Sequence, residues 1–243
     1  MSKILLLSLR DGPLGNSVAA AEARDVMQAT GLTNDTLVHR ILESTEHVVG
    51  DLTDISGVII GGSSLNITDP EWSLWQHHVH QQLAELIDGP LPVFLICYGT
   101  SWLTHHTGGA VSHAHAEDSG PTVVRLTDAG REDILLQGFP GEFTSLTGHT
   151  ENAETPSGAL EVLATGPSCP VQLVRYGDRV WASQFHAEMD AQAMKTRMDF
   201  YYDYGYFSPA DYDTIVAGLP SVDTTWANFI LRRFVETCFT ARY

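Results

Sequence analysis

One cysteine in this sequence, Cys97, stands where its thiol could act as a nucleophile. It directly follows the apolar run Pro92–Ile96, which is typical of a buried strand, and it precedes Tyr98-Gly99, where a helix is expected to begin. A side chain on such a sharp strand-to-helix turn is exposed, as in the nucleophile elbow of hydrolases. The N–H groups and the positive dipole end of the helix favour a thiolate. Taken alone, the pattern also fits a buried structural thiol.

A histidine and an acid that could activate this thiol follow the predicted strand Val180–Phe185. His186 and Glu188 are two residues apart, and in an extended chain such residues point to the same side. The carboxylate could then orient the imidazole and stabilise its protonated form, while the other ring nitrogen faces a thiol. Taken alone, the pair has a simpler interpretation as surface residues that leave a strand.

A glycine pair could supply a third part of such a site. Gly61 and Gly62 follow another apolar run, Ile55–Ile60, which again predicts a buried strand. Glycines at this position allow backbone N–H groups to approach a ligand closely, as an oxyanion hole requires. Ligands of α/β proteins gather outside the carboxyl ends of the strands, so such strand ends are the places to look for a site.

The elements that must position these residues alternate between strands and helices in the first half of the chain. Apolar runs predict strands at Lys3–Ser8, Thr36–Ile41, Ile55–Ile60 and Pro92–Ile96. One helix is expected over Ser17–Thr30, stopped by Gly31, and another from Asp69-Pro70-Glu71, a favourable capping sequence. The second helix has an apolar face of Trp72, Trp75, Val79, Leu83 and Leu86. The alternation predicts a three-layer α/β fold with a mostly parallel central sheet flanked by helices.

The second half of the chain predicts a small antiparallel addition to this sheet. Short strands with turn signals between them are expected at Thr122–Leu126, Glu142–Leu146, Leu160–Ala164, Val171–Arg175 and Val180–Phe185. The last two should form a hairpin around Gly177-Asp178, and helices should follow from about Asp190. Because no linker or repeat divides the chain, we expect a single domain over residues 1–243, with a core of about 1–190 and a helical extension of about 191–243.

Composition excludes several classes of protein. The 243 residues include 30 Asp and Glu against 13 Lys and Arg, giving a net charge of −17, whereas nucleic-acid binding needs clustered Lys and Arg. The 43% hydrophobic content excludes a disordered chain. Three distant cysteines make no disulfide framework, and no apolar run approaches the roughly 18 residues of a membrane span. We therefore expect a cytoplasmic protein with no nucleic-acid or membrane partner.

Taken together, the three chemical features resemble the class I glutamine amidotransferases, in particular the glutaminase domain of GMP synthetase and its stand-alone relatives. The family's Gly-x-Cys-x-Gly-x-Gln motif corresponds to Leu95–Ser101, and its Val-Gln-Phe-His-Pro-Glu motif to Ser183–Glu188. Asp69-Pro70-Glu71-Trp72 resembles the family's acidic-Pro-Trp helix start. Gly148-His149 with the downstream Pro156-Ser157-Gly158 resembles its Ser-His segment. The resemblance covers roughly residues 1–190.

The resemblance implies a glutaminase-type reaction, in which a γ-glutamyl amide is hydrolysed through a thioester without a metal or other cofactor. It implies a catalytic triad of Cys97, His186 and Glu188, and an oxyanion hole made by the N–H groups of Gly62 and Tyr98. The substrate, glutamine or another γ-glutamyl small molecule, would be held by Gly61, Gly99, Ser101, Gly148, His149 and Gln184. A separate synthase or acceptor subunit would fit the family, and the oligomeric state, including a homodimer, stays open.

Four departures from the family motifs bear on the substrate. Leu95 stands in place of Gly, Ser101 in place of Gln, Gly148 in place of Ser and Ala187 in place of Pro. The triad positions are retained, so cysteine chemistry is still expected, whereas the binding of free glutamine is altered. A γ-glutamyl peptidase that works without a synthase partner is therefore one alternative, and a non-enzymatic binding relative is another. The sequence also contains no phosphate-binding loop of a synthetase.

The remaining chemical side chains favour structural interpretations. His113, His115 and Glu117 could suggest a metal site, but their Gly- and Ser-rich surroundings are typical of a loop. Five further histidines are expected at solvated helix positions: His77, His78, His80, His105 and His106. Cys169 and Cys238 are interpreted as a loop thiol and a core thiol. The aromatic segment Phe200–Phe207 indicates packing onto the sheet or, alternatively, a surface for a partner.

Overall fold

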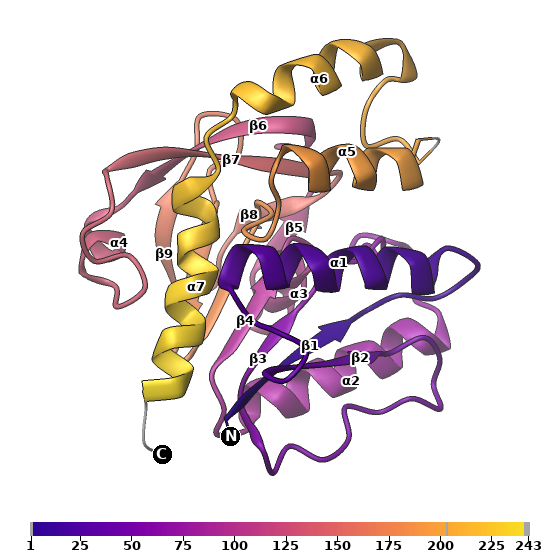
Figure 1. The fold of residues 1–243 in the computed structure, drawn as a ribbon, viewed down its shortest axis with the longest axis vertical. Coiled ribbons are helices and arrows are strands. Elements are labelled where there is room, and N and C mark those ends of the chain that lie inside the picture. Colours follow the sequence, from indigo (N-terminus) through magenta and orange to yellow (C-terminus); the bar gives the residue numbers. More distant parts are fainter. Residues whose placement is uncertain (1, 203, 241–243) are drawn as a thin grey trace.

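The computed structural model describes residues 2–202 and 204–240. Residue 203 of the aromatic segment and the end residues 1 and 241–243 of the expected domain therefore lie outside the described part. The described residues form a nine-stranded sheet in the order β2-β1-β3-β4-β11-β10-β9-β6-β7 and a two-stranded sheet of β5 and β8 (Figure 1). The strands are β1 Lys3–Ser8, β2 Leu37–Ile41, β3 Ile55–Ile60, β4 Val93–Ile96, β5 Ala110–Ser112, β6 Glu117–Leu126, β7 Glu142–His149, β8 Asn152–Thr155, β9 Leu160–Thr165, β10 Leu173–Tyr176 and β11 Val180–Ser183.

The large sheet has a parallel part and an antiparallel part. Strands β2, β1, β3, β4 and β11 run parallel, and β10, β9, β6 and β7 continue the same sheet with antiparallel pairings. This arrangement confirms the predicted fold class. The predicted hairpin is β10–β11, which turns at Gly177 with a positive φ of 61°. The short strands β5 and β8 were not predicted, because three or four residues carry too little hydrophobic pattern.

Helices cover both faces of the parallel part and make it the middle of three layers (Figure 1). They are α1 Gly15–Thr30, α2 Leu74–Asp88, α3 Tyr98–His106, α4 Asp128–Glu132, α5 Ala191–Phe200, α6 Tyr212–Gly218 and α7 Thr225–Thr240. Strand β1 shows how the two faces are filled: Ile4 and Leu6 join the core cluster under α1 and α7, whereas Leu5 and Leu7 join the cluster under α2 and α3. No helix within the described residues is long and apolar enough to span a bilayer.

Helix α2 begins four residues later than the sequence predicted. The favourable start at Asp69-Pro70-Glu71 lies in the turn before the helix, and Ser73 caps α2 by accepting a hydrogen bond from the N–H of Gln76 at 3.1 Å. Ser is as good an N-cap as Asp, so two competing caps stood close together in the sequence. Trp72 consequently lies outside the helix, where its indole N–H donates to the Ile67 carbonyl at 3.2 Å.

The last described helix, α7, is fixed to the sheet by a close approach to β3. A Cβ atom added to Gly57 would lie 2.3 Å from the Cys238 sulfur, so only glycine leaves room for this buried thiol. Cys238 is 2% exposed, as expected for a core residue. Burial raises the pKa of its thiol to about 12, which leaves it unreactive at neutral pH.

Candidate active site

Three neighbouring strands bring the chemical features of the sequence to one edge of the sheet. Gly61 and Gly62 follow β3, Cys97 follows β4, and His186 lies shortly after β11. These strands are adjacent and parallel in the order β3-β4-β11, so their carboxyl ends lie side by side. The N–H of Cys97 donates to the Ser183 carbonyl at 2.7 Å, which fixes the turn after β4 to the end of β11. The edge therefore brings together residues that the sequence singled out as a candidate site.

Cys97 has a strained backbone. Its φ of 53° and ψ of −96° make it the only residue other than glycine with a positive φ within the described residues. Such a conformation costs about 1–3 kcal/mol and is characteristic of functional turns. Cys97 is followed at once by α3, whose first residue is Tyr98. The N–H groups in the first turn of a helix have no acceptor within the helix, so they are available to an anion beside the sulfur.

Leu95 explains why residue 99 must be glycine. A Cβ atom on Gly99 would lie 2.3 Å from the Leu95 Cβ atom, because the first turn of α3 folds back onto the end of β4. The family departure at Leu95 is therefore accommodated by the fold, with the side chain fully buried under α3. The close packing against Leu95 thus explains the glycine at residue 99 without any role in substrate binding.

We expect Gly99→Ala to destabilise the protein. The added methyl group meets a backbone-proximal atom that cannot move away, and overpacking of this kind costs about 1–3 kcal/mol. The free energy of unfolding, measured by urea titration, should fall by that amount. Gly218→Ala is the matched control, since a Cβ atom there has no neighbour within 4 Å. An unchanged stability of Gly99→Ala would contradict the packing argument.

His186 and Glu188 form a buried pair beside Cys97. The Nδ1 atom of His186 and the Oε1 atom of Glu188 are 2.7 Å apart, and the two residues are 6% and 2% exposed. The sequence predicted an extended chain here, which is wrong: Ala187 and Glu188 lie in a turn. His186 is held by a single bridge to β7, in which its N–H donates to the Leu146 carbonyl at 2.9 Å. The turn still brings the carboxylate to the ring.

The charges of this pair stabilise an imidazolium. Burial lowers the pKa of His186, but the Glu188 carboxylate and the neighbouring Cys97 raise it by more, so the pKa lies above its ordinary value. Burial raises the pKa of Glu188, while the His186 charge, its hydrogen bond and the more distant Arg197 lower it below its ordinary value. The pair therefore holds a protonated imidazole against an ionised carboxylate at neutral pH.

The two glycines after β3 have different surroundings. A Cβ atom on Gly62 would lie 3.4 Å from the His186 ring and 3.6 Å from the Cys97 Cβ atom, so Gly62 faces both side chains. A Cβ atom on Gly61 would lie 2.3 Å from the carboxylate of buried Glu22. Gly62 thus lies next to Cys97 and His186, whereas Gly61 makes room for a buried acid.

A pocket on one side of Cys97 contains most of the other predicted substrate residues. It encloses about 250 Å³, including its mouth, and its lining includes Ser101, His149 and Gln184. Ser101 is 1% exposed, and its hydroxyl has no hydrogen-bond partner among the described residues. We call this space the glutamyl pocket, after the part of the substrate that the sequence resemblance would place there. It is lined by Ser63, Leu65, Asn66, Cys97, Tyr98, Ser101, His149, Thr150, Glu151, Gln184 and Tyr206.

A comparison with known families decides where this fold belongs. The family model of glutamine amidotransferase class-I matches residues 19–201. The chain belongs to the class I glutamine amidotransferase family. The matched segment runs from α1 to the end of α5 and includes Cys97, His186 and Glu188.

Individual relatives match shorter segments of this chain than the family model does. A GMP synthase [glutamine-hydrolyzing] of Aeropyrum pernix is 31% identical over 134 residues, which are 55% of this chain and 24% of that protein. One subunit of the glutamine-hydrolyzing GMP synthase of Methanococcus maripaludis is 27% identical over 104 residues, which are 42% of this chain and 53% of that protein. The match thus spans about a quarter of the length of the former.

Solved structures share the fold of the whole described chain. A glutamine amidotransferase from Thermotoga maritima superposes with a TM-score of 0.76 at 18% identity, covering 98% of this chain and 99% of that chain. A glutamine amido transferase from Methylobacillus flagellatus gives a TM-score of 0.67 at 15% identity, covering 96% and 94% of the two chains. These likenesses extend past α5, so the fold of the C-terminal helices is shared as well.

Gly148 lies between the two sides of the site. Its carbonyl oxygen is 4.0 Å from the Cys97 sulfur, and a Cβ atom at this position would lie 2.8 Å from the Ser119 hydroxyl. The neighbouring strand β6 therefore explains why this chain has glycine where the family carries a serine. Gly148 faces the site with its backbone alone.

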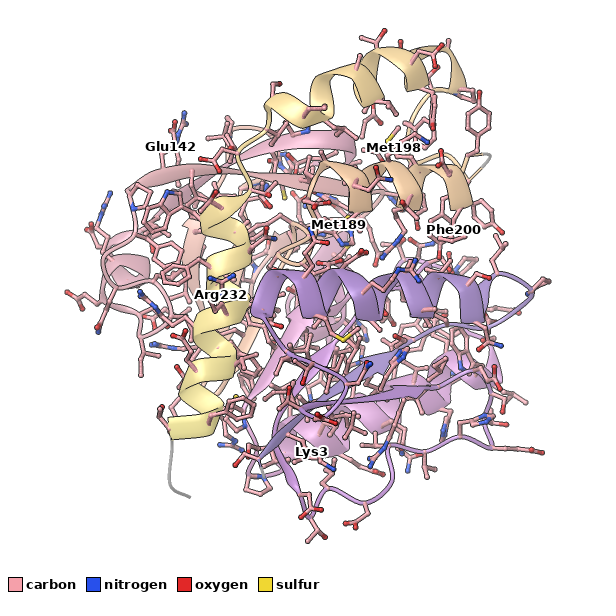
Figure 2. All side chains as sticks on the ribbon, viewed as in Figure 1. Lys3, Glu142, Met189, Met198, Phe200 and Arg232 are labelled. Carbon is pink, nitrogen blue, oxygen red and sulfur yellow. The ribbon has the colours of Figure 1, made fainter. Side chains whose placement is uncertain are left out.

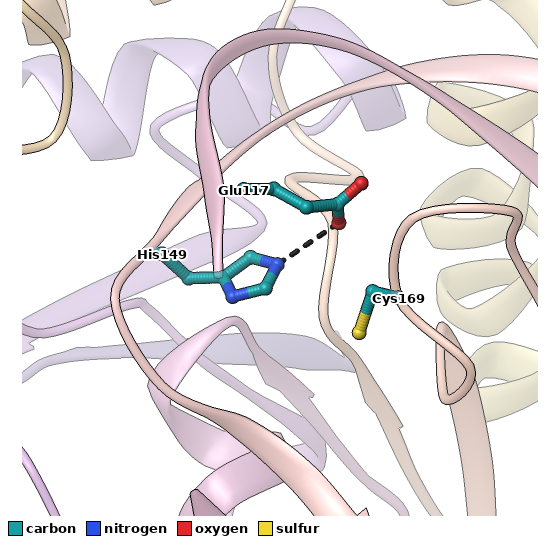
Figure 3. A group of neighbouring side chains, drawn as sticks. All are labelled: Glu117, His149 and Cys169. Carbon is teal, nitrogen blue, oxygen red and sulfur yellow. Dashed lines mark hydrogen bonds and ion pairs between the residues drawn. The ribbon is translucent and has the colours of Figure 1, made fainter. Parts of the chain in front are cut away.

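His149 is held by a buried hydrogen-bond network (Figure 3). Its Nδ1 atom is 2.9 Å from the Glu151 carbonyl and its Nε2 atom is 2.9 Å from Glu117, so both ring nitrogens face acceptors. The Glu117 carboxylate also accepts hydrogen bonds from Thr122, Ser168 and Gln172. Burial raises the pKa of Glu117, but these hydrogen bonds lower it by more than burial raises it. The pKa of Glu117 is therefore about 2. The network fixes the imidazole that borders the glutamyl pocket.

The same network includes the one group in the described residues with the spacing of metal ligands, namely Glu117, His149 and Cys169 (Figure 3). Glu117 already accepts two hydrogen bonds at each oxygen, and the Cys169 thiol donates to the Val171 carbonyl at 3.5 Å. Burial raises the pKa of Cys169 to about 12, which disfavours the thiolate that a metal needs. These contacts describe a structural network.

The cluster of His113, His115 and Glu117 that the sequence suggested is not brought together. His113 is exposed and forms hydrogen bonds with Thr68 and Thr150 instead.

A second pocket on the other side of Cys97 was missed in the sequence. It encloses about 460 Å³, including its mouth, and it is formed largely by α5 and the aromatic segment. Met189 lies just before α5 and Met198 lies on it (Figure 2). We call this space the Met/Tyr pocket. Its lining includes Cys97 and His186. The other side chains that form it are those of Arg10, Met189, Met194, Arg197, Met198, Tyr201, Tyr206 and Phe207.

The aromatic segment is thus part of the site. Tyr206 and Phe207 were interpreted as packing residues or as a partner surface, and they do pack: the Tyr206 carbonyl accepts the Ser119 N–H at 2.8 Å, and Phe207 is buried against Leu146. They also close one end of the Met/Tyr pocket. The sequence did not indicate that Arg10 belongs to the site. An arginine after a strand is normally exposed, and its partner Glu22 lies on a different element.

The helical histidines are only partly solvated. His77, His105 and His106 are exposed, as expected, but His78 and His80 are half-buried. The Nε2 atom of His80 is 2.7 Å from the Tyr98 hydroxyl. Burial, together with the neighbouring histidines, lowers the pKa of His80 to about 4. A neutral His80 therefore holds the side chain of the residue that follows Cys97.

Proposed function

We propose that this protein hydrolyses a γ-glutamyl amide through a thioester on Cys97. The observation that carries the proposal is the strained turn of Cys97 beside the buried His186–Glu188 pair. The family to which the chain belongs gives the reaction type, glutamine-dependent transfer of an amide nitrogen. The residues of this site supply a nucleophile, a base and an orienting carboxylate for it.

In the proposed first half-reaction, the proton of the Cys97 thiol has already passed to His186, and the Cys97 thiolate attacks the carbon of the γ-carbonyl group. The imidazolium that results is stabilised by Glu188, which has ionised before the reaction. When the C–N bond breaks, His186 returns the proton to the leaving nitrogen. Water then attacks the thioester, gives its proton to His186, and releases glutamate while the thiol is restored.

The developing oxyanion needs hydrogen-bond donors that are in place before the reaction. We assign this role to the N–H groups of Gly62 and Tyr98, the first next to both catalytic side chains and the second at the start of α3. The glutamyl pocket would hold the amino acid part of the substrate, with Ser101, His149 and Gln184 among its polar groups. Gly61 and Gly99 contribute through packing.

A second activity, hydrolysis of γ-glutamyl peptides without a synthase, is favoured by two observations. Ser101 replaces the family's longer glutamine, and the Met/Tyr pocket provides space on the leaving-group side. The first experiment is therefore an assay of glutamate and ammonia release from glutamine beside a panel of γ-glutamyl dipeptides. The intact protein, quenched in acid during turnover, should also show a glutamyl adduct on Cys97 by mass spectrometry. If no substrate of the panel is hydrolysed, the remaining alternative is that the protein is a non-enzymatic binding relative of the family.

The Ser101 position can be tested directly. We expect Ser101→Gln to raise kcat/KM for glutamine, because it restores the residue that the family uses in the glutamine pocket and gives the buried position a longer polar group. A rise of severalfold in steady-state ammonia release is the expected result. Unchanged glutamine kinetics with damaged hydrolysis of γ-glutamyl peptides would instead favour the peptidase.

We further propose that residues 1–243 act as one domain, since α7 packs against α1 and β3 on the same core as the first strands. The Methanococcus maripaludis relative is named as one subunit of its GMP synthase, which supports a separate synthase chain as the partner of this protein. Copurification with a synthase and ammonia release that depends on it would support that arrangement.

A further inference from the structure

Glutamine leaves the Met/Tyr pocket unused. Cys97, Ser63 and Tyr206 border both this pocket and the glutamyl pocket, so the thiol lies between the two. A γ-carbonyl at Cys97 with its glutamyl part in one pocket directs the scissile C–N bond toward the other. Ammonia would occupy a small part of this space, which encloses about 460 Å³ including its mouth.

The walls of the Met/Tyr pocket are apolar and adaptable. Met194 and Met198 are one helical turn apart on α5, and Met189 and Phe207 complete the same buried cluster. Methionine side chains are unbranched and polarisable, and they fit ligands of varied shape. An aliphatic or aromatic group would therefore gain from entering this pocket, whereas ammonia or a glycine would not.

Two buried arginines are part of the pocket lining. Arg10 is 4% exposed; its Nη2 atom is 2.8 Å from Glu22 and its Nη1 donates to the Tyr201 hydroxyl at 3.0 Å. Arg197 is 8% exposed, and its Nη2 atom is 3.7 Å from Asp25. The Nε atom of Arg10 and the Nη2 atom of Arg197 are buried and have no hydrogen-bond partner within the described residues. Buried donors of this kind are normally satisfied, so both call for an acceptor.

Asp25, the acid near Arg197, does not fully neutralise the positive charge of Arg197. Burial raises the pKa of Asp25 more than Arg197 lowers it, to about 7, and the nearby acids Glu188, Glu22 and Asp190 raise it too. At neutral pH, Asp25 is therefore protonated in a substantial fraction of molecules. A carboxylate on a ligand would find a guanidinium with residual positive charge and an unused donor.

We propose that the Met/Tyr pocket binds the leaving group of the substrate, and that this leaving group is an α-amino acid with an apolar side chain. The substrates are then γ-glutamyl dipeptides, with the apolar side chain among the methionines and the carboxylate at Arg10 and Arg197. This inference rests on the proposed function. The Cys97 sulfur bonds to the carbon of the γ-carbonyl group, the C–N bond at that carbon breaks, and the free amino acid departs with the proton from His186; water then converts the thioester to glutamate.

Four substrates test this inference on the purified wild-type protein: γ-Glu-Leu, γ-Glu-Gly, γ-glutamyl isoamylamide and glutamine. The isoamylamide keeps the leucine side chain but lacks its carboxylate. Burial of the side chain should raise kcat/KM for γ-Glu-Leu roughly ten- to a hundredfold over γ-Glu-Gly. Hydrogen bonds to the carboxylate should give a similar factor over the isoamylamide.

The outcomes separate this inference from the proposed function. Preferences of fivefold or more in both comparisons support the inference. Hydrolysis of glutamine with a smaller preference in either comparison overturns it, while the proposed function stands. Failure to hydrolyse any of the four substrates overturns both.

A variant locates the effect in the pocket. Met198→Trp should fill the space next to α5, so the ratio of kcat/KM for γ-Glu-Leu to that for glutamine should fall at least tenfold. Val48→Trp is the matched control, since Val48 is 58% exposed and does not line the pocket. If Met198→Trp does not fold, product inhibition serves instead: leucine should inhibit wild-type glutamine hydrolysis at concentrations roughly tenfold or more below those of glycine. Equal inhibition by the two amino acids would contradict the assignment.

Discussion

Cys97→Ala is expected to remove all hydrolysis of γ-glutamyl amides and to leave the fold intact. No other side chain at the site can form the thioester, and loss of a covalent nucleophile lowers turnover by roughly a millionfold in serine hydrolases. The side chain is small and lies at a turn, so the unfolding midpoint should stay near that of the wild type. Glutamate release and urea unfolding of the same preparation check both statements.

Cys238→Ala is the matched control for this variant. Cys238 is also a buried free thiol, but it lies in α7 against Gly57 and far from the strand ends that form the site. It should retain wild-type turnover. Hydrolysis that survives in a contaminant-free preparation of Cys97→Ala would exclude the thioester mechanism.

Replacement of the carboxylate at residue 188 should also lower turnover strongly. Glu188→Gln keeps the size of the side chain and a hydrogen bond to His186 but removes the charge that stabilises the imidazolium. In the serine-protease triad, the corresponding change lowers turnover by about four powers of ten. A thiol ionises more readily than a hydroxyl, so we expect a smaller loss here, on the order of ten- to a thousandfold in kcat, and a larger one for His186→Ala.

The pH profile of Glu188→Gln distinguishes loss of charge from general damage. Glu188 raises the pKa of His186, so its removal lowers that pKa, and the imidazolium loses its proton at a lower pH. The alkaline limb of kcat/KM should therefore move to lower pH in the variant. Glu43→Gln is the control, because it removes the acid of an exposed His–Glu pair, with 3.6 Å between His47 and Glu43. A wild-type rate and profile for Glu188→Gln would mean that another group orients His186.

Sequence periodicity predicted the parallel part of the fold well, because β1, β3 and β4 are apolar runs that are covered on both faces. Strand β1 was predicted to the residue and β3 likewise, and Gly31 ends α1 in the left-handed conformation. The start of α2 was placed wrongly because two good caps compete, and only tertiary packing decides between Asp69 and Ser73. Strands β5 and β8 escaped prediction because they are set by pairing partners rather than by pattern.

At the site, sequence reasoning found the residues whose chemistry is local to a strand end. Cys97, Gly62 and His186 each follow a strand, and the adjacency of β3, β4 and β11 then brings them together. The Met/Tyr pocket could not be predicted in this way. Its residues come from the loop after β1, from α5 and from the aromatic segment, and nothing in their spacing indicates that buried Arg10 will line the same pocket as Met198. Long-range packing between elements carries that information.

The position of β11 between β4 and β10 has a consequence for synthesis on the ribosome. Ser183 pairs with Ile96, so the middle of the sheet has a gap until the chain has been made well beyond residue 183. Until then β4 lacks a neighbour on one side, and the turn at Cys97 lacks the Ser183 carbonyl that fixes it. Pairings between distant segments form slowly and leave apolar strand edges exposed. A nascent chain of this protein should therefore carry an unorganised, inactive Cys97 and depend on chaperones until β11 inserts.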